Sequence, residues 1–375
     1  MQSTHQIWPD PARYIAARRP DRPVAFFCPR ELTACARRFL DGFPGSVTYA
    51  VKANPDAEVL TNLHLAGIGA FDVASPAEID LVRRFAPGAA LHYNNPVRSP
   101  DEIAHAAAAG VKSYSVDCPR ELDKLAGVIP AGSEISVRLK LPVAGAAYDF
   151  GSKFGAPAED CVALLRAVKT RGLGPSMTFH PGTQCTDPRA WAHYITACAG
   201  IAQQAGVRLG RLNVGGGFPS DRGQRPRLEP IFAAIRATTQ AAFDTPPELL
   251  CEPGRAMVAE SVTLGLRVKA VRPDGAVFLN DGIYGGLAEL RDDMPNRRIT
   301  VLSPGGRARQ GKPVARVVFG PTCDSLDRLP GMVGLPADLA EGDHVLFRGM
   351  GAYAAAITTR FNGYGRLDPV TVTRN

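Results

Sequence analysis

The sequence predicts an α/β protein, with an N-terminal (β/α)8 barrel over residues 28–260 and a C-terminal antiparallel β-domain. The β-domain, of β-sandwich type, is expected to comprise residues 1–27 and 261–375. Three observations predict this fold. Eight apolar, strand-like runs recur between residues 46 and 252, stretches of helical spacing lie between them, and the helical pattern stops near residue 260. Repeated strand–helix alternation favours a parallel barrel, whereas the later alternating runs favour antiparallel strands.

The elements follow from periodicity and turn signals. Barrel strands are predicted at residues 46–53, 69–74, 90–94, 113–117, 134–141, 175–180, 211–214 and 248–252. Alanine- and leucine-rich stretches between them predict helices, among them 57–67, 76–86, 100–110, 158–172 and 188–206. Strands of the β-domain are expected within 261–271, 275–281, 298–302, 315–320 and 343–349, and residues 24–27 are a candidate to join them.

Composition excludes several classes of function. The 375 residues are 45% hydrophobic and 21% charged, which suffices for one large domain and a smaller one. The net charge of +7 is spread along the chain, without a Lys/Arg block that would bind nucleic acid or a membrane. The start has no signal-peptide core, and no run approaches the roughly 18 apolar residues of a membrane span. A cytoplasmic protein is expected.

The cysteines predict neither disulfides nor a metal site. The chain has eight, with no CxxC pair and no Cys/His cluster at zinc spacing. Seven are expected to be small buried hydrophobes in a reducing compartment. Cys323 is the exception, because of the motif around it.

Lys52 is the first candidate for chemistry. In YAVKANP, residues 49–55, it follows an alternating apolar run and precedes the turn signal Asn54-Pro55. A lysine held partly out of water has a lowered pKa, so its neutral amine can attack a carbonyl or pyridoxal phosphate. The sequence therefore predicts a Schiff-base lysine at a strand end.

Other polar residues follow the predicted strands in the same way. Barrel enzymes build their active sites at the carboxyl ends of the strands. The residues at or just past those ends are Lys52, Asp72, Asn94, Asp117, Arg138, His180, Gly215–Gly217, and Glu252 with Arg255. We expect them to gather at one rim.

This set suits an anionic, aromatic cofactor. The glycines of VGGGFP let backbone N–H groups approach a phosphate, and Arg255 can add a charge-assisted clamp. His180 offers a flat ring for stacking, and Thr183 a hydroxyl that can donate to phosphate. A carboxylate at Glu252, beside a pyridine nitrogen, would keep that nitrogen protonated and make the ring an electron sink.

Seven motifs together carry a resemblance to a known family. In chain order they are YAVKANP, FDVAS, TFHPGTQC, NVGGGFP, CEPGR, FGPTCDSLD and GAYAAAITTRFNGY. They resemble the fold-type III pyridoxal-phosphate decarboxylases, the family of ornithine, diaminopimelate and arginine decarboxylases. The likeness spans nearly the whole chain. It implies pyridoxal 5'-phosphate as cofactor, a small amino acid as substrate, and a head-to-tail homodimer with two shared active sites.

The resemblance also implies roles for individual residues. Lys52 would carry the cofactor, His180 would stack on its ring, and Glu252 would pair with the ring nitrogen. The cofactor phosphate would be held by Thr183, Gly215, Gly216, Gly217, Arg255 and Tyr353. The residues that resemble those positioning the lysine and the cofactor's phenolic oxygen are Asp72, Glu78 and Arg138.

The segment FGPTCDSLD bears on the substrate. It resembles the ornithine decarboxylase version, in which a Cys-Asp pair enters the neighbouring subunit's active site. Cys323 would return a proton to the substrate carbon, and Asp324 would receive the distal ammonium of a diamino acid. Tyr284 and Asp293, or its neighbour Asp292, are further candidates for substrate contact. The expected reaction converts L-ornithine to putrescine and carbon dioxide.

Several alternatives stay open. The stretch LAELRDDMP lacks the aromatic-Asp pair usual in ornithine enzymes, so L-lysine or another diamino acid is an alternative substrate. Diaminopimelate enzymes carry Glu-Ser after the cysteine where this chain has Asp-Ser, and carboxynorspermidine is a further candidate. An alanine-racemase-like enzyme would need a tyrosine acid instead of the Cys-Asp element. A catalytically inactive homologue with a binding or regulatory role would be expected to have lost Lys52, Arg255 or Cys323, and all three are present.

Overall fold

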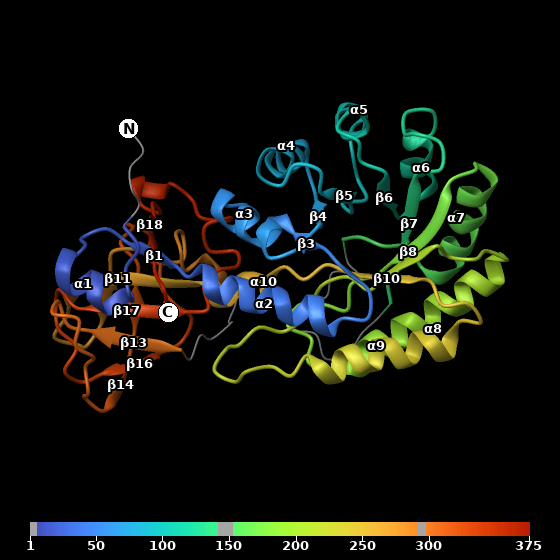
Figure 1. The fold of residues 1–375 in the computed structure, drawn as a ribbon. Coiled ribbons are helices and arrows are strands. Elements are labelled where there is room, and N and C mark those ends of the chain that lie inside the picture. The colour runs from blue at the N-terminus through green and yellow to red at the C-terminus, as the bar shows by residue number, and fades with distance from the viewer. Residues whose placement is uncertain (1–5, 142–152, 292–297) are drawn as a thin grey trace. The chain divides into compact units, whose positions relative to one another are not determined.

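The computed structural model describes residues 6–141, 153–291 and 298–375 (Figure 1). Contacts divide the chain into two units. The barrel unit comprises residues 36–219 and 226–257, and the β unit comprises residues up to 35, 220–225 and those from 258 onward. The short segment 220–225 belongs to the β unit, where Arg222 forms an ion pair with Glu289.

The barrel unit is built on parallel strands, as expected. Its sheet runs in the order β2-β10-β9-β8-β7-β6-β5-β4-β3. The strands are β2 Ser46–Val47, β3 Tyr49–Ala50, β4 Ala70–Val73, β5 Ala90–Tyr93, β6 Ser113–Val116, β7 Glu134–Arg138, β8 Gly174–Thr178, β9 Arg211–Asn213 and β10 Glu248–Cys251.

The first predicted strand forms two short strands, β2 and β3, and these close the barrel. β2 pairs with β10, β3 pairs with β4, and Thr48 separates them. Both the backbone N–H and the hydroxyl of Thr48 donate to the carbonyl of Cys251, at 2.9 and 3.0 Å. The two ends of the sheet are thus consecutive pieces of one strand, so the expected eight-stranded (β/α)8 arrangement is confirmed.

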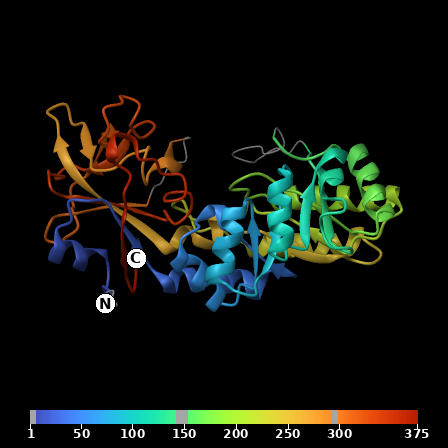
Figure 2. The same cartoon turned by 90° about the horizontal axis from the view of Figure 1, so that it is seen from above.

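Helices cover the outside of the barrel (Figure 2). They are α3 Ala57–Leu65, α4 Pro76–Phe85, α5 Pro100–Ala108, α6 Pro119–Leu125, α7 Ala158–Thr170, α8 Pro188–Ala205 and α9 Glu229–Ala242, preceded by α2 Pro29–Gly42. Ser75, Ser99 and Asp187 cap α4, α5 and α8 by accepting hydrogen bonds from backbone N–H groups of the first turn. A proline follows each of these caps, which is the preferred start of a helix.

The barrel strands separate apolar and polar side chains onto opposite faces. The fully buried Phe71, Val73, Val116 and Val137 alternate with residues such as Asp72 and Ser136. Residues paired across neighbouring strands share a face. The inward face therefore carries Asp72, His92, Asn94, Ser113, Ser115, Glu134, Ser136, Ser176, Arg211 and Asn213. Many such barrels fill this space with branched apolar side chains, whereas the interior of this barrel is largely polar.

The β unit contains a seven-stranded sheet and a two-stranded hairpin. The main path is β13-β17-β11-β1-β18, with β12 beside β11 and β15 beside β12, and β14 pairs with β16. Bounds are β1 Val24–Phe27, β11 Val262–Val271, β12 Val277–Leu279, β13 Ile299–Leu302, β14 Pro313–Arg316, β15 Val318–Phe319, β16 Val333–Pro336, β17 His344–Arg348 and β18 Asp368–Thr371. Helix α1, Pro11–Arg18, precedes β1.

The N-terminal strand joins this sheet in its interior. β1 pairs antiparallel with β11 and parallel with β18, so the expectation for residues 24–27 is confirmed. Most pairings are antiparallel, as expected, and β12 with β15 forms a second parallel pair. Among the described residues, no helix combines the length and the apolar character that crossing a bilayer requires.

Packing between β1 and β11 gives a test of the sheet. A Cβ at Gly265 in β11 would lie 2.7 Å from the ring of Phe26, which is fully buried. We predict that Gly265→Ala lowers the free energy of unfolding by about 1–3 kcal/mol through overpacking, measured by urea denaturation.

The matched control for this variant is Gly334→Ala in β16. The nearest atom to a Cβ there is Pro313 Cβ at 3.8 Å, which is ordinary contact. Its effect is expected within about 0.5 kcal/mol of zero. Equal losses of stability in the two variants would contradict the β1–β11 packing.

Candidate functional site

The carboxyl ends of the barrel strands bring several predicted residues to one rim. Lys52 lies in the turn Val51–Ala53 after β3, Asp72 lies in β4, and Arg138 ends β7. His180 follows β8 by two residues, and Glu252 directly follows β10. The charge of Lys52 acts on the pKa values of Asp72, His180 and Glu252, so these groups share one electrostatic environment.

The placement of Lys52 corrects one expectation. The sequence predicted a lysine held partly out of water, yet its side chain is exposed in the structure, whereas Val51 and Ala53 beside it are buried. The cause is the 3-10 turn, which directs its two apolar residues into the core and its middle residue outward. The amine of Lys52 is therefore accessible to a ligand at the rim.

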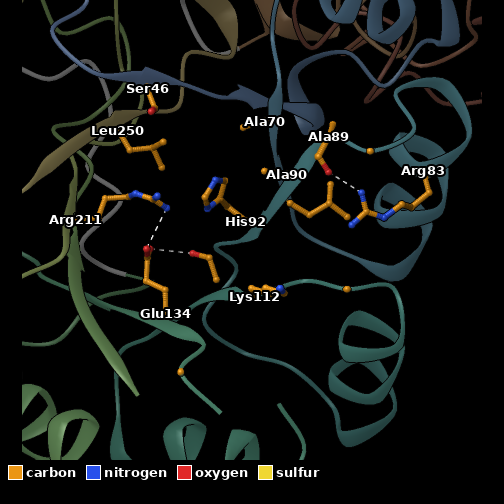
Figure 3. A pocket seen from close by; sticks show the side chains of 15 residues that line it. Ser46, Ala70, Arg83, Ala89, Ala90, His92, Lys112, Glu134, Arg211 and Leu250 are labelled. Carbon is orange, nitrogen blue, oxygen red and sulfur yellow. Dashed lines mark hydrogen bonds and ion pairs between the residues drawn. The ribbon is translucent and has the colours of Figure 1, made fainter. Parts of the chain in front are cut away.

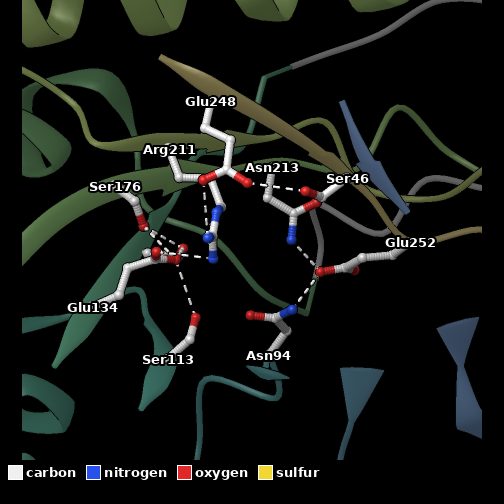
Figure 4. A network of polar contacts seen from close by, with 10 residues as sticks. Ser46, Asn94, Ser113, Glu134, Ser176, Arg211, Asn213, Glu248 and Glu252 are labelled. Carbon is white, nitrogen blue, oxygen red and sulfur yellow. Dashed lines mark hydrogen bonds and ion pairs between the residues drawn. The ribbon is translucent and has the colours of Figure 1, made fainter. Parts of the chain in front are cut away.

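Glu252 is held by two amides. One of its carboxylate oxygens accepts hydrogen bonds from Nδ2 of Asn94, directly after β5, and from Nδ2 of Asn213 in β9 (Figure 4). Burial raises the pKa of Glu252, while the Asn213 hydrogen bond and the charges of Lys52 and Arg138 oppose that shift. The two amides thus stabilise the ionised form of this carboxylate.

Asp72 adds a second carboxyl group, which is buried, whereas Glu252 is half-buried. Burial raises the pKa of Asp72 well above the ordinary value, and the charge of Glu252 raises it further. The charges of Lys52 and Arg138 oppose the rise for both carboxyl groups. A cationic ligand group beside Glu252, such as a protonated ring nitrogen, would stabilise the ionised carboxylate further.

Asn94 also has an unused acceptor. Its Oδ1 is buried without a hydrogen-bond partner among the described residues. By contrast, Asn213 Oδ1 accepts from the N–H of Gly215 at 2.9 Å, which ties Glu252 to the glycine loop. Sequence reasoning placed Asn94 at the rim without a specific role and did not single out Asn213. The available signal was that both are polar residues at the carboxyl end of a strand.

The three glycines pack backbone against backbone. A Cβ at Gly215 would lie 2.1 Å from the Phe179 carbonyl oxygen, and one at Gly217 would lie 2.1 Å from that of Gly182. Both have positive φ, +68° and +80°. A Cβ at Gly216 would lie 2.7 Å from the carbonyl oxygen of Glu252. Only glycine fits this loop, which lies directly against the segments carrying His180 and Glu252.

His180 is held as a neutral ring. Its Nδ1 accepts a hydrogen bond from the N–H of Gly182 at 3.1 Å, which assigns the ring proton to Nε2. Burial lowers its pKa well below the ordinary value, and the charges of Lys52 and Arg138 lower it further. Thr183 is half-buried on the same loop, and Arg255 begins the short helix α10, Arg255–Val258.

Two further rim carboxylates fix loops. Glu78 accepts from the N–H of Ala74 at 2.7 Å, which shapes the segment after β4, and burial raises its pKa. Asp117 accepts from the N–H of Gly155 at 3.0 Å. Both contacts are to backbone N–H groups, so they fix the conformation of the rim loops.

The β unit brings together the predicted substrate residues. Tyr284 donates its hydroxyl to Oδ2 of Asp324 at 2.6 Å, and this bond lowers the pKa of Asp324. The N–H of Cys323 donates to Asn362 Oδ1 at 3.0 Å, and the thiol-bearing residue is exposed. Tyr353 adopts a left-handed φ of 56°, uncommon for a bulky residue. Asp292 and Asp293 lie outside the described residues.

A buried aspartate that sequence reasoning missed anchors this cluster. Asp327 accepts from the N–H and the hydroxyl of Thr322, at 3.1 and 2.8 Å, and from the N–H of Ile283 at 3.0 Å. It therefore joins the segment before Cys323 to the segment before Tyr284. Nearby, burial raises the pKa of Asp281 to about 6.

The donor set fits an organic cofactor. In the described part of the chain, no group of three or more His, Cys, Asp or Glu residues is arranged to hold a metal ion. The barrel rim instead offers an amine, a carboxylate supported by two amides, a neutral flat imidazole and a glycine loop. These groups match an anionic aromatic aldehyde with a basic ring nitrogen.

Comparisons with known proteins agree with this geometry. Residues 30–259 match the family described as "Pyridoxal-dependent decarboxylase, pyridoxal binding domain". The lysine/ornithine decarboxylase of Selenomonas ruminantium is 33% identical over 330 residues, covering 85% of this chain and 81% of its own length. The ornithine decarboxylase of Cricetulus griseus is 30% identical over 350 residues, covering 88% of this chain and 76% of its own.

A solved structure extends the likeness to three dimensions. The arginine decarboxylase of Paramecium bursaria Chlorella virus superposes with a TM-score of 0.86 at 25% identity, covering 96% of this chain and 98% of its own. The chain therefore belongs to the pyridoxal-dependent decarboxylase family and is an amino-acid decarboxylase that uses pyridoxal phosphate on basic amino acids.

Proposed function

We propose that the protein decarboxylates L-ornithine to putrescine and carbon dioxide. The pairing of Asp324 with Tyr284 supports a substrate with a distal ammonium group, and the resemblance of FGPTCDSLD to the ornithine enzymes favours ornithine among such substrates. The Tyr284 hydroxyl lowers the pKa of Asp324, so this carboxylate is ionised and fixed in direction. An ionised, oriented carboxylate discriminates for a substrate with a distal ammonium group.

The barrel residues are proposed to hold the cofactor. Pyridoxal phosphate, when bound, supplies a ring that accepts the electron pair released as the bond from Cα to the carboxylate breaks. Lys52 would bind its aldehyde carbon covalently and give way to the substrate amine. Asp72, Glu78 and Arg138 would position that lysine. The phosphate would be held by Thr183, Gly215, Gly216, Gly217, Arg255 and Tyr353.

Glu252 and His180 would bind the ring itself. Asn94 and Asn213 favour the ionised Glu252, which can keep a ring nitrogen protonated. The neutral His180 presents an uncharged face suited to stacking, and its fixed Nδ1 contact with Gly182 holds the ring plane.

Proton return is assigned to Cys323. We propose a cytoplasmic head-to-tail homodimer in which the partner subunit's Cys323 protonates the substrate carbon after carbon dioxide leaves. The exposure of Cys323 supports this proposal, as does that of Leu326 close by in the sequence, which is 67% exposed. Exposed apolar side chains around a reactive residue suit a surface that a second subunit covers.

L-Lysine is the second candidate substrate. The relatives described above bear the names of lysine/ornithine, ornithine and arginine decarboxylases. The amino acids in these names share a distal cationic group and differ in its distance from Cα. The candidates for residues that select for this distance are Asp293, Asp292 and Tyr284. Diaminopimelate, carboxynorspermidine and an inactive regulatory role are further alternatives that the experiments below separate.

The cofactor link is tested on Lys52. Borohydride reduction of the protein loaded with pyridoxal phosphate is expected to attach a pyridoxyl group to the peptide containing Lys52, detected by mass spectrometry. Lys52→Ala should carry no label and show no carbon dioxide release. A label on another lysine, with Lys52 unmodified, would refute the assignment.

Substrate choice is tested by kinetics on ornithine, lysine, arginine and diaminopimelate side by side. L-Ornithine is expected to give the highest kcat/KM. Asp324→Asn should lower kcat/KM for ornithine by about ten- to a hundredfold, because it removes a charge-assisted contact with the distal ammonium.

Tyr284→Phe is the matched control for this variant, since it removes the 2.6 Å hydrogen bond and keeps the carboxylate. We expect a smaller loss for it than for Asp324→Asn. A higher kcat/KM for lysine or arginine would overturn the ornithine proposal. An equal loss of kcat/KM on all four substrates in Asp324→Asn would show that Asp324 does not select the substrate.

Proton return is tested with Cys323→Ala. This variant is expected to bind cofactor and release carbon dioxide, yet to misplace the proton and yield aldehyde in place of part of the diamine. Product analysis by chromatography checks this, and an unchanged diamine yield argues against the role.

Mixing the two variants tests the shared sites. A mixed dimer of Lys52→Ala and Cys323→Ala has one site with both native residues. Random reassociation should therefore restore about a quarter of the native diamine yield. Recovery would be absent if each subunit used its own Cys323.

A further inference from the structure

A cavity lies at the amino ends of the barrel strands, whereas Lys52 follows the carboxyl end of β3 (Figure 3). It has a volume of about 790 Å³ and is lined by residues at the amino ends of the strands, including Ser46, Ala90, Ser113, Glu134 and Arg211. This volume is in the range of small-molecule sites. None of the residues proposed above to bind cofactor or substrate lines it.

The cavity contains buried polar atoms with unused hydrogen-bonding capacity. His92 in β5 is 6% exposed, and its Nδ1 has no hydrogen-bond partner among the described residues. The Nε of Arg211 in β9 is likewise buried without one. Figure 3 shows both side chains facing the cavity. A buried polar atom without a partner costs free energy that a ligand can recover.

The charges around the cavity favour an anion. Arg83, Lys112 and Arg211 line it together with Glu134, and Arg211 also pairs with Glu248. Three cations against two carboxylates leave one positive charge. Both ion pairs of Arg211, at 3.0 and 3.1 Å, use its Nη atoms, so its Nε is not engaged by the carboxylates. Lys112 is exposed at the mouth and can turn toward a ligand.

The cavity is lined by a glycine in each of three successive helix-to-strand loops. Gly88, Gly110 and Gly132 have φ of +83°, +79° and +74°. A Cβ at Gly88 or Gly132 would meet no atom within 4 Å, and one at Gly110 would meet only Arg83 Nη2 at 3.9 Å. The entrance therefore has room for a ligand of several heavy atoms.

We propose that this cavity binds a small anion bearing a carboxylate or phosphate group. Lys112 supplies a mobile charge, Arg211 a guanidinium held in place by Glu134 and Glu248, and His92 a ring whose proton position adapts to the ligand. This site is independent of the substrate proposed above. In support, burial and the charge of Arg211 lower the pKa of His92 to about 4, so the ring is neutral and its surroundings are electropositive.

The proposal is tested by nuclear magnetic resonance on the pyridoxal-phosphate-saturated enzyme with carbon-13-labelled histidine. The chain has seven histidines, and the His92 signal is assigned by its loss in His92→Gln. Inorganic phosphate and succinate are titrated separately. We expect a saturable shift of the His92 signal with a Kd of about 1 mM or tighter for at least one anion, and a raised pKa for His92 in the bound state.

Lys112→Ala should weaken this binding about tenfold or more, because it removes a charge-assisted contact. The matched control is Lys169→Ala, an exposed lysine in α7 outside the cavity, which should bind as the native enzyme does. A response to phosphate alone or to succinate alone identifies the preferred group. The absence of any saturable shift, or equal affinity in the Lys112 and native proteins, would overturn the proposal.

Discussion

Closure of the parallel barrel is the constraint on which the site depends. The first strand bonds on one side to β10 through β2 and on the other to β4 through β3, with Thr48 as the joint. A closed parallel barrel places every strand's carboxyl end at one rim. Residues from segments about two hundred positions apart, such as Lys52 and Glu252, therefore enter one electrostatic environment without any long loop to bring them there.

The polar interior of the barrel joins its two ends. Near the amino ends, Arg211 bridges Glu134 and Glu248, and near the carboxyl ends Glu252 accepts from two asparagines. Three strands take part in both groups. β5 carries His92 and is directly followed by Asn94, β9 carries Arg211 and Asn213, and β10 carries Glu248 and is directly followed by Glu252. A hydrogen-bonded interior fixes side-chain directions more tightly than an apolar one, which suits a carboxylate that must face one ring atom.

The sequence was sufficient to predict the barrel and β-domain architecture, because the strands and helices follow from periodicity. It was also sufficient to predict which residues lie at the rim, because polar residues follow the strand ends. It was insufficient wherever the outcome depends on which atoms meet. The amides of Asn94 and Asn213 reach one oxygen of Glu252 only through the register of three strands. The exposure of Lys52 depends on a 3-10 turn, and segment 220–225 joins the β unit through the Arg222–Glu289 pair. No local pattern encodes these contacts.

The position of β1 inside the β sheet has a consequence for biosynthesis. β1 is translated before the barrel unit, whereas its partners β11 and β18 are translated after the barrel unit. β18 lies near the end of the chain. The barrel can complete its own contacts on the ribosome, whereas β1 must wait with unsatisfied backbone groups on both edges. An unpaired strand of this kind is suited to binding by chaperones. Truncation of β18 would leave one edge of β1 unpaired and prone to aggregation.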